Sequence, residues 1–293
     1  MSTHTGNWNY PTAVRVGAGR ISELPKACRQ LGMTSPLLVT DPGLAALPMV
    51  EASLQLCRDA GLQAGLFSAV KGNPTGGNVA DGVAALKAGQ HDGVIAFGGG
   101  SAIDAAKAIA LVAHQECTLW EAGPGTVDAS KMLPVVAVPT TAGTGSEVGR
   151  ASVITNSETH VKKIIFHPKM LPAVVICDPE LTIGLPPKLT AGTGLDAFAH
   201  CVEAYSSPHF HPMSQGIALE GLRLVKEYLP RAYKDGTDIE ARGQMMAAAS
   251  MGAVAFQKGL GAIHAISHPI GAVYNTHHGT TNAVVMAAVL DMN

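Results

Sequence analysis

The second half of the sequence holds an aspartate and several histidines at spacings that suit metal binding. Asp196 and His200 lie four residues apart in the stretch Gly-Leu-Asp-Ala-Phe-Ala-His. On a helix, residues i and i+4 share one face, so both side chains could reach the same ion. A single pair of this kind is more often a structural hydrogen bond than a metal site.

A second cluster of histidines makes metal binding the favoured interpretation. His264 and His268 are again one helical turn apart, in an apolar stretch, and His277 and His278 follow. An imidazole in apolar surroundings is costly unless it is hydrogen-bonded or coordinates a metal. One carboxylate with several histidines suits Fe²⁺, Zn²⁺ or Mn²⁺ and excludes neither Co²⁺ nor Ni²⁺. Glu203, three residues after His200, is at most a residue that supports a ligand.

A glycine-rich turn in the first half is suited to binding phosphate. An apolar predicted strand runs into Gly98-Gly99-Gly100-Ser101 and then directly into a predicted helix. Glycines let the backbone approach a phosphate closely, and a helix N-terminus offers free N–H groups and a favourable dipole. The spacing matches neither GxGxxG nor the P-loop. The alternative is a tight turn that binds no ligand.

Polar residues follow two other predicted strands. Asp41 comes directly after the first one, where an acidic residue in dinucleotide-binding folds contacts the ribose hydroxyls and repels a 2′-phosphate. This position favours NAD over NADP, although Asp-Pro-Gly taken alone is more often a turn. The Thr-, Ser- and Gly-rich segment 139–147 suits a polar ligand lying across strand ends, and Asn73 could add an amide to the same site.

The pattern of apolar segments predicts two domains that position these residues. Between residues 36 and 186, predicted strands at 37–40, 64–69, 93–97, 135–138 and 173–177 alternate with predicted helices at 48–60, 78–88 and 101–112. This alternation is typical of βαβ units with a parallel sheet. Beyond Pro186, long Ala-, Leu- and Met-rich segments indicate helices at 193–205, 213–227, 239–255 and 261–274. We therefore predict an α/β dinucleotide-binding domain at 1–186 and an all-α metal-binding domain at 187–293.

Composition excludes several classes of function. The chain has 293 residues, of which 47% are hydrophobic and 14% charged, as expected for a globular protein with a large core. A net charge of −2 and scattered Lys and Arg residues argue against binding to nucleic acid or to an anionic membrane. The five cysteines form no CxxC pair, and the N-terminus lacks a signal-peptide pattern. We expect a cytoplasmic protein with reduced thiols.

Taken together and in this order, the motifs resemble those of the iron-containing (group III) alcohol dehydrogenase family, over essentially the whole chain. Four stretches carry the resemblance: Gly98–Asp104, Pro139–Glu147, Asp196–His200 and His264–Gly279. The resemblance implies a dehydroquinate synthase-like fold and a homodimer or larger assembly. It also implies a metal-dependent oxidoreductase that transfers a hydride between a small primary alcohol, or the aldehyde in reverse, and NAD(H).

The resemblance also implies roles for individual residues. The metal, most commonly Fe²⁺ in this family, would be held by Asp196, His200, His264 and His278, with His268 assisting proton transfer. The expected cofactor-binding residues are Asp41, Asn73, Gly98, Gly99, Gly100, Ser101, Thr140, Thr141, Thr144 and Lys162. Lys163 competes with Lys162 for its role.

The sequence departs from the family pattern in two respects. His277 stands where relatives often carry another residue, commonly proline, but the glycine that follows favours His278 as the ligand. Family members usually continue with further helices, so the helical domain is expected to be shortened at its C-terminus relative to the family. The alternatives are a maleylacetate-reductase-like or dehydroquinate-synthase-like enzyme on the same scaffold, or a catalytically silent homologue that binds metal or nucleotide.

Overall fold

The computed structural model describes residues 12–292 and forms two compact units. An α/β unit consists of residues 12–140 and 149–181, and a helical unit of 141–148 and 182–292. This division differs from the predicted ranges, 1–186 and 187–293, chiefly in the segment 141–148. That segment belongs with the helical unit because Gly145 lies against Ala249 and Ala253, where a Cβ atom would come within 2.3 Å of Ala253.

The α/β unit contains a six-stranded, fully parallel sheet in the order β1-β8-β5-β4-β2-β3. Its strands are β1 (Ala13–Val16), β2 (Pro36–Val39), β3 (Gly65–Phe67), β4 (Gly93–Gly98), β5 (Val135–Pro139) and β8 (Val174–Cys177). The strands β2, β4, β5 and β8 are buried along their whole length, because helices cover both faces of the sheet. The parallel α/β fold predicted from the sequence is confirmed.

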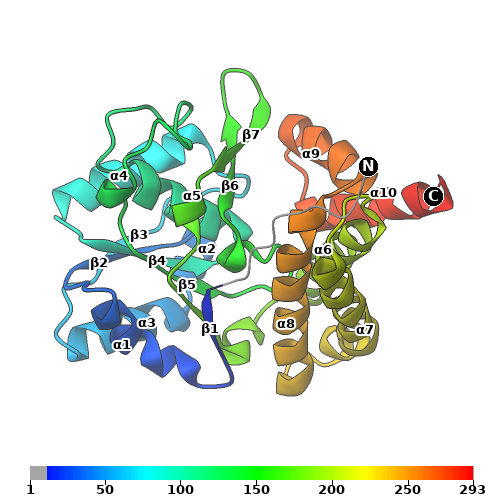
Figure 1. The fold of residues 1–293 in the computed structure, drawn as a ribbon. Helices are drawn as coiled ribbons and strands as arrows, with labels where there is room; N and C mark the ends of the chain where they lie inside the picture. Colours follow the sequence, from blue (N-terminus) through cyan, green and yellow to red (C-terminus); the bar gives the residue numbers. More distant parts are fainter. Residues whose placement is uncertain (1–11, 293) are drawn as a thin grey trace. The chain divides into compact units, whose positions relative to one another are not determined.

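Figure 1 shows α1 (Leu24–Gln30) and α3 (Pro48–Asp59) on one face of the sheet, and α4 (Gly76–Ala88) and α5 (Gly100–Val112) on the other. The short α2 (Pro42–Ala45) follows β2. Residues of α1 and α3 pack in one core with Leu38, Ile95 and Phe97 of the sheet. This core fixes the strand ends from which the predicted nucleotide-binding residues project.

An antiparallel hairpin, β6 (Ala151–Asn156) and β7 (Val161–Phe166), also belongs to this unit and was not predicted. The residues of β6 alternate in burial and most residues of β7 are exposed, and the polar Ser, Thr and Lys side chains make the sequence resemble a loop. Helix α5 holds the hairpin through two hydrogen bonds to β6. Lys107 donates to the carbonyl group of Ala151, and the Asp104 carboxylate accepts a 2.9 Å hydrogen bond from the amide of Val153.

The helical unit consists of α6 (Pro187–Ser206), α7 (Pro212–Lys234), α8 (Ile239–Ala255), α9 (Ala262–Tyr274) and α10 (His278–Met292). Helices α6, α7 and α8 pack through small residues such as Ala197, Ala248 and Ala249, which let their backbones approach closely. The described residues of the two units also contain short 3₁₀ turns, which are η1 (Arg20–Glu23), η2 (Ala129–Lys131), η3 (Ser146–Val148), η4 (Pro168–Met170), η5 (Pro179–Thr182) and η6 (Phe256–Lys258). None of the helices in residues 12–292 combines the length and hydrophobicity needed to cross a membrane.

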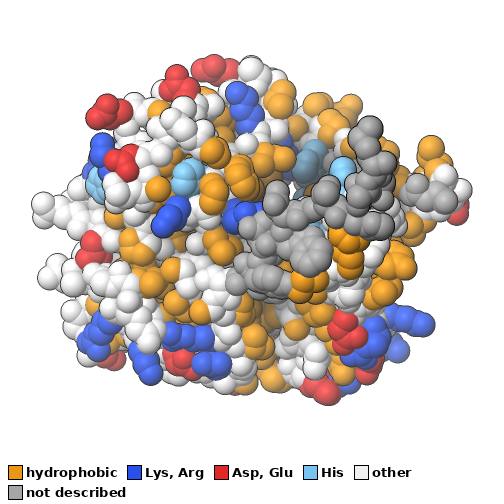
Figure 2. All heavy atoms as spheres, in the orientation of Figure 1, with side chains coloured by type: hydrophobic (Ala, Val, Ile, Leu, Met, Phe, Trp, Pro, Cys, Tyr) orange, Lys and Arg blue, Asp and Glu red, His pale blue; other side chains and the backbone are white. Residues whose placement is uncertain are grey.

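The surface carries charges of both signs. On the face drawn in Figure 2, the Lys and Arg side chains are interspersed with Asp and Glu side chains and with apolar ones. This pattern agrees with the small net charge of −2.

Candidate metal centre

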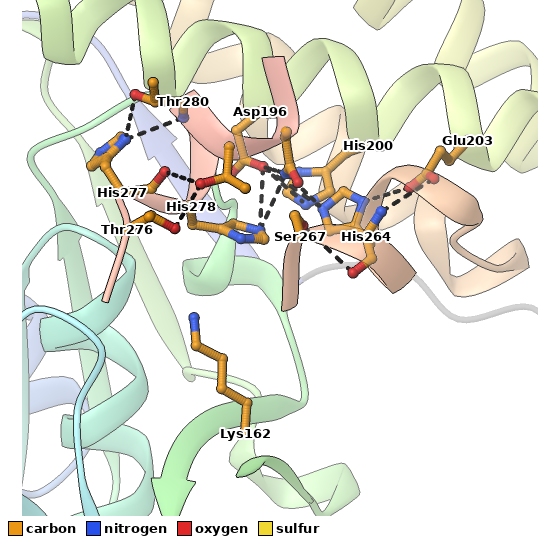
Figure 3. A network of polar contacts seen from close by, with 12 residues as sticks. Lys162, Asp196, His200, Glu203, His264, Ser267, Thr276, His277, His278 and Thr280 are labelled. Atoms are coloured by element: carbon orange, nitrogen blue, oxygen red, sulfur yellow. Dashed lines mark hydrogen bonds and ion pairs between the residues drawn. The ribbon is translucent and has the colours of Figure 1, made fainter. Parts of the chain in front are cut away.

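Three helices bring the predicted metal ligands together in the helical unit. Asp196 and His200 lie one turn apart on α6, while His264 is in the first turn of α9 and His278 begins α10. In Figure 3 the three imidazole rings surround the Asp196 carboxylate. The distances from Asp196 Oδ1 to the Nε2 atoms are 3.8 Å for His200, 3.7 Å for His264 and 3.6 Å for His278.

The carboxylate at the middle of the centre is buried and has no cationic Lys or Arg partner among the described residues. Asp196 is 2% exposed. Burial alone raises the pKa of Asp196, but His200, His264 and His278 outweigh this effect and lower the pKa. Burial also lowers the pKa of His200, to about 4. The site therefore holds an ionised carboxylate beside an imidazole that stays neutral at pH 7.

His264 experiences the opposite balance. Burial lowers its pKa, but hydrogen bonds and charges from Asp196 and Glu203 outweigh burial and raise the pKa to about 9. Two carboxylates thus favour a positive charge at this ring. A proton or a metal ion on Nε2 can supply that charge, and a metal ligand must give up the proton.

The structure distinguishes His278 from its neighbour His277. His277 Nδ1 accepts a 3.3 Å hydrogen bond from the amide of Thr280 and lies 3.0 Å from the Thr280 hydroxyl group. This geometry caps the N-terminus of α10, while the His278 ring points toward Asp196 (Figure 3). A Cβ atom at position 279 would lie 2.2 Å from the Gly192 carbonyl oxygen, so only glycine allows this approach.

Asn282 is part of the centre and was missed from the sequence. It is fully buried, and its Nδ2 donates a 2.6 Å hydrogen bond to Asp196 Oδ1. The same nitrogen lies 3.2 Å from His264 Nε2 and 3.3 Å from His278 Nε2. Its position four residues after His278, on the same face of α10, is the signal that could have revealed it.

His268 lies next to the rings of His264 and His278. Its ring centroid is 5.2 Å from that of His278 and 5.7 Å from that of His264. The side chain is half-buried, unlike the buried His200 and His264. A ring in this position can link the centre to solvent, which suits the predicted role in proton transfer.

In the α/β unit, the glycine turn and two other predicted residues occur at neighbouring strand ends. Gly98 ends β4, Gly99 caps α5, and Gly100 and Ser101 form the first turn of that helix. Thr140 directly follows β5, and its amide donates a 3.0 Å hydrogen bond to the Gly98 carbonyl group. Asp41 lies two residues after the end of β2, and its Oδ1 accepts a 3.0 Å hydrogen bond from the amide of Leu44, capping α2. Carboxyl ends of parallel strands are where such sheets bind ligands.

The remaining predicted cofactor residues are divided between the units. Lys162 Nζ donates a 2.7 Å hydrogen bond to Asn73 Oδ1, which brings these two together in the α/β unit. Lys163 instead lies 5.7 Å from the centre of the Trp120 ring, an arrangement that involves it in a local cation–π contact. Thr141 and Thr144 belong to the segment that packs with the helical unit.

Comparison with known families decides the assignment. The sequence profile of the family described as iron-containing alcohol dehydrogenase matches residues 11–179. The C-terminal profile of the Fe-containing alcohol dehydrogenase family matches residues 190–293. The chain belongs to the iron-containing alcohol dehydrogenases. The resemblance seen in the motifs is thereby confirmed, and with it the assignment as an oxidoreductase.

Individual proteins and solved structures share sequence or fold with this chain. The 4-hydroxybutyrate dehydrogenase of Cupriavidus necator is 43% identical over 97% of this chain and 76% of that protein. A crystal structure of 1,3-propanediol oxidoreductase superimposes with a TM-score of 0.93 and 38% identity, covering 97% of this chain and 75% of that one. The crystal structure of sulfoacetaldehyde reductase from Bifidobacterium kashiwanohense in complex with NAD⁺ superimposes with a TM-score of 0.90 and 30% identity. The match covers 99% of this chain and 77% of that one.

Membership in this family implies a divalent metal and NAD(H), and the observed donor set fits the metal. The ligand atoms of Asp196, His200 and His264 lie within 4.8 Å of one another. Nitrogen and carboxylate ligands lie about 2.1 Å from such ions, so two ligands of one ion are roughly 3–4 Å apart. Neutral imidazoles and one carboxylate suit a borderline divalent ion such as Fe²⁺ or Zn²⁺.

Proposed function

We propose that this iron-containing alcohol dehydrogenase oxidises a small primary alcohol with NAD⁺, and reduces the corresponding aldehyde with NADH. We further propose that Asp196, His200, His264 and His278 hold the metal, with Fe²⁺ the expected ion and Zn²⁺ or Mn²⁺ as alternatives. The observation that carries the proposal is the approach of three Nε2 atoms to Asp196 Oδ1, at 3.6–3.8 Å.

The preference for a primary alcohol rests on the relatives. One of them is a 4-hydroxybutyrate dehydrogenase and another a 1,3-propanediol oxidoreductase, and both of these substrates carry a terminal hydroxyl group. Sequence identities of 43% and 38% over nearly the whole of this chain support a similar class of substrate. The first compound carries a carboxylate and the second a further hydroxyl group, so the assay panel includes both hydroxy acids and diols.

The proposed reaction removes a hydride and a proton from the alcohol, and the hydride reduces NAD⁺ to NADH. The metal supplies Lewis acidity, which makes a hydroxyl group easier to deprotonate. His268 takes up the released proton and passes it to solvent, since its half-buried ring lies beside that of His278. Asn282 keeps Asp196 in place through a hydrogen bond.

In the α/β unit, we propose that the strand ends bind the dinucleotide. The backbone amides of the Gly98–Ser101 turn, at the N-terminus of α5, would bind the pyrophosphate. Asp41 would contact the ribose hydroxyls and disfavour NADP, and Thr140 lies next to the turn. Asn73, Lys162, Thr141 and Thr144 are proposed as further contacts.

The test is an anaerobic assay of NADH formation with a panel of short alcohols, diols and hydroxy acids. The protein would be assayed as purified, after chelation, and after Fe²⁺, Zn²⁺ or Mn²⁺ is restored. We expect the activity to disappear with the chelator and to return with one of the metals, which also identifies the ion. Full turnover after complete removal of metal would contradict the proposal.

A further inference from the structure

Glu203 makes three contacts to the start of α9 from its position on α6. It is 6% exposed, and its Oε1 accepts hydrogen bonds from the amides of Ile263, at 2.6 Å, and His264, at 3.4 Å. Its Oε2 contacts Nδ1 of the His264 ring. One carboxylate therefore bonds both the backbone and the side chain of this histidine (Figure 3).

The local sequence makes room for this carboxylate. Gly261 precedes α9 and offers no side-chain cap to the helix, so Glu203 satisfies the first amides from another helix. A Cβ atom at position 261 would lie 3.0 Å from Glu203 Oε1. A glycine at this position thus allows the carboxylate to approach the helix end.

The contact with the ring decides which nitrogen of His264 can bind a metal. A carboxylate only accepts hydrogen bonds, so Nδ1 must carry the proton that it donates to Glu203. In a neutral imidazole, Nε2 then keeps its lone pair, and this is the nitrogen 3.7 Å from Asp196 Oδ1. The hydrogen bond also fixes the plane of the ring.

His200 shows what is different about His264. Among the described residues, Nδ1 of His200 has no hydrogen-bond partner. Its ring stacks on His264 with centroids 4.7 Å apart and meets Phe256 edge-on at 5.0 Å. The orientation imposed on His264 is therefore passed on to His200 through the stacked rings.

We infer that Glu203 is the positioning residue of the metal centre: it holds His264 in the Nδ1-protonated form, with Nε2 directed at the metal, and through stacking it orients His200. This inference rests on the proposed metal site and adds to it a residue that touches neither metal nor substrate. A helix cap alone would not require a carboxylate, because one acceptor oxygen is sufficient to bind the amides. The second oxygen, Oε2, is needed only for the contact with the His264 ring.

The variant Glu203→Gln tests this role with minimal change of shape. A glutamine has one acceptor oxygen and one donor nitrogen, so it cannot accept from both Ile263 and the His264 ring. We expect affinity for Zn²⁺, measured by competition with a chromophoric chelator, to fall about 10–100-fold. Glu220→Gln, in an exposed ion pair on α7, is the matched control and should leave the Zn²⁺ affinity unchanged. A Glu203→Gln affinity within about twofold of the wild type would overturn the inference.

A second measurement needs no variant and separates positioning from folding. In the Zn²⁺-loaded wild-type protein, long-range ¹H–¹⁵N NMR of labelled histidines reports which nitrogen of His264 carries the proton. We expect a proton on Nδ1 and a metal-shifted Nε2, whereas a proton on Nε2 would overturn the inference even if Glu203→Gln misfolds. Failure of the wild-type chain to bind Zn²⁺, Fe²⁺ or Mn²⁺ would instead refute the proposed function, so the two failures are distinct.

Discussion

The metal centre and the glycine turn use their residues in opposite ways. In the helical unit, side chains from α6, α9 and α10 contact one another, and the chemistry depends on individual side-chain atoms such as Asp196 Oδ1 and His264 Nε2. At the strand ends of the α/β unit, the polar side chains serve local structure, as when Asp41 caps α2. The groups that we propose for binding the pyrophosphate there are backbone amides.

The difference follows from what each ligand requires. A metal ion binds donor atoms about 2 Å away, in a geometry that only converging side chains provide here. A pyrophosphate can be bound by the amides of a helix N-terminus and by close approach of a glycine backbone. Side-chain changes should therefore be most harmful in the helical unit, and changes of backbone freedom in the glycine turn.

The largest expected effect is on metal affinity, and it should differ between the adjacent residues His278 and His277. His278→Ala removes one Nε2 donor, and we expect metal affinity to fall by more than the roughly 100-fold that marks loss of a supporting residue. His277→Ala is the matched control, since it removes only the cap of α10 and should cost about 1 kcal/mol of unfolding free energy. Equilibrium dialysis and chemical denaturation would measure these effects. Equal metal affinity in the two variants would break the comparison.

A backbone change should act on the other unit. Gly98 has a φ of 141°, and a Cβ atom there would lie 2.9 Å from that of Ala102. We expect Gly98→Ala to cost about 1–3 kcal/mol of unfolding free energy and to weaken NADH binding about tenfold or more, with metal affinity unchanged. Gly72→Ala is the control, because a Cβ atom added at position 72 would meet no atom within 4 Å. NADH fluorescence titration and thermal unfolding measure both effects, and undiminished NADH binding would count against the turn as the pyrophosphate site.

The smallest expected effect concerns choice of coenzyme. Asp41→Asn keeps an acceptor oxygen for the amide of Leu44, so α2 should stay capped while the negative charge is lost. We expect the ratio of NADP to NAD affinity to rise about tenfold, equivalent to roughly 1.4 kcal/mol. Titrations with both coenzymes would measure this ratio. An unchanged ratio would mean that Asp41 serves only as a helix cap.

Much of the fold could be predicted because strong local patterns produce it. The predicted helix 239–255 agrees with α8, and the predicted strand 93–97 agrees with β4 to within one residue. The β6–β7 hairpin and α10 were missed, because polar residues interrupt the hairpin and the helix follows an isolated His-His pair. In both cases contacts with other elements, such as the hydrogen bond between α5 and β6, determine the local structure.

The sequence by itself determined that the centre consists of one aspartate and several histidines, and that Asp196 and His200 lie together on one helix. Asp196 and His200 are one turn apart on a single helix, so local geometry alone places them on one face. The glycine after His278 already favoured this residue over His277, and the structure shows its approach to Asp196. Only the tertiary structure decided that Asn282 bonds the same carboxylate and that Glu203 reaches His264. The physical reason is that these contacts join residues 60 or more positions apart. Their distances depend on how helices pack, which local spacing does not specify.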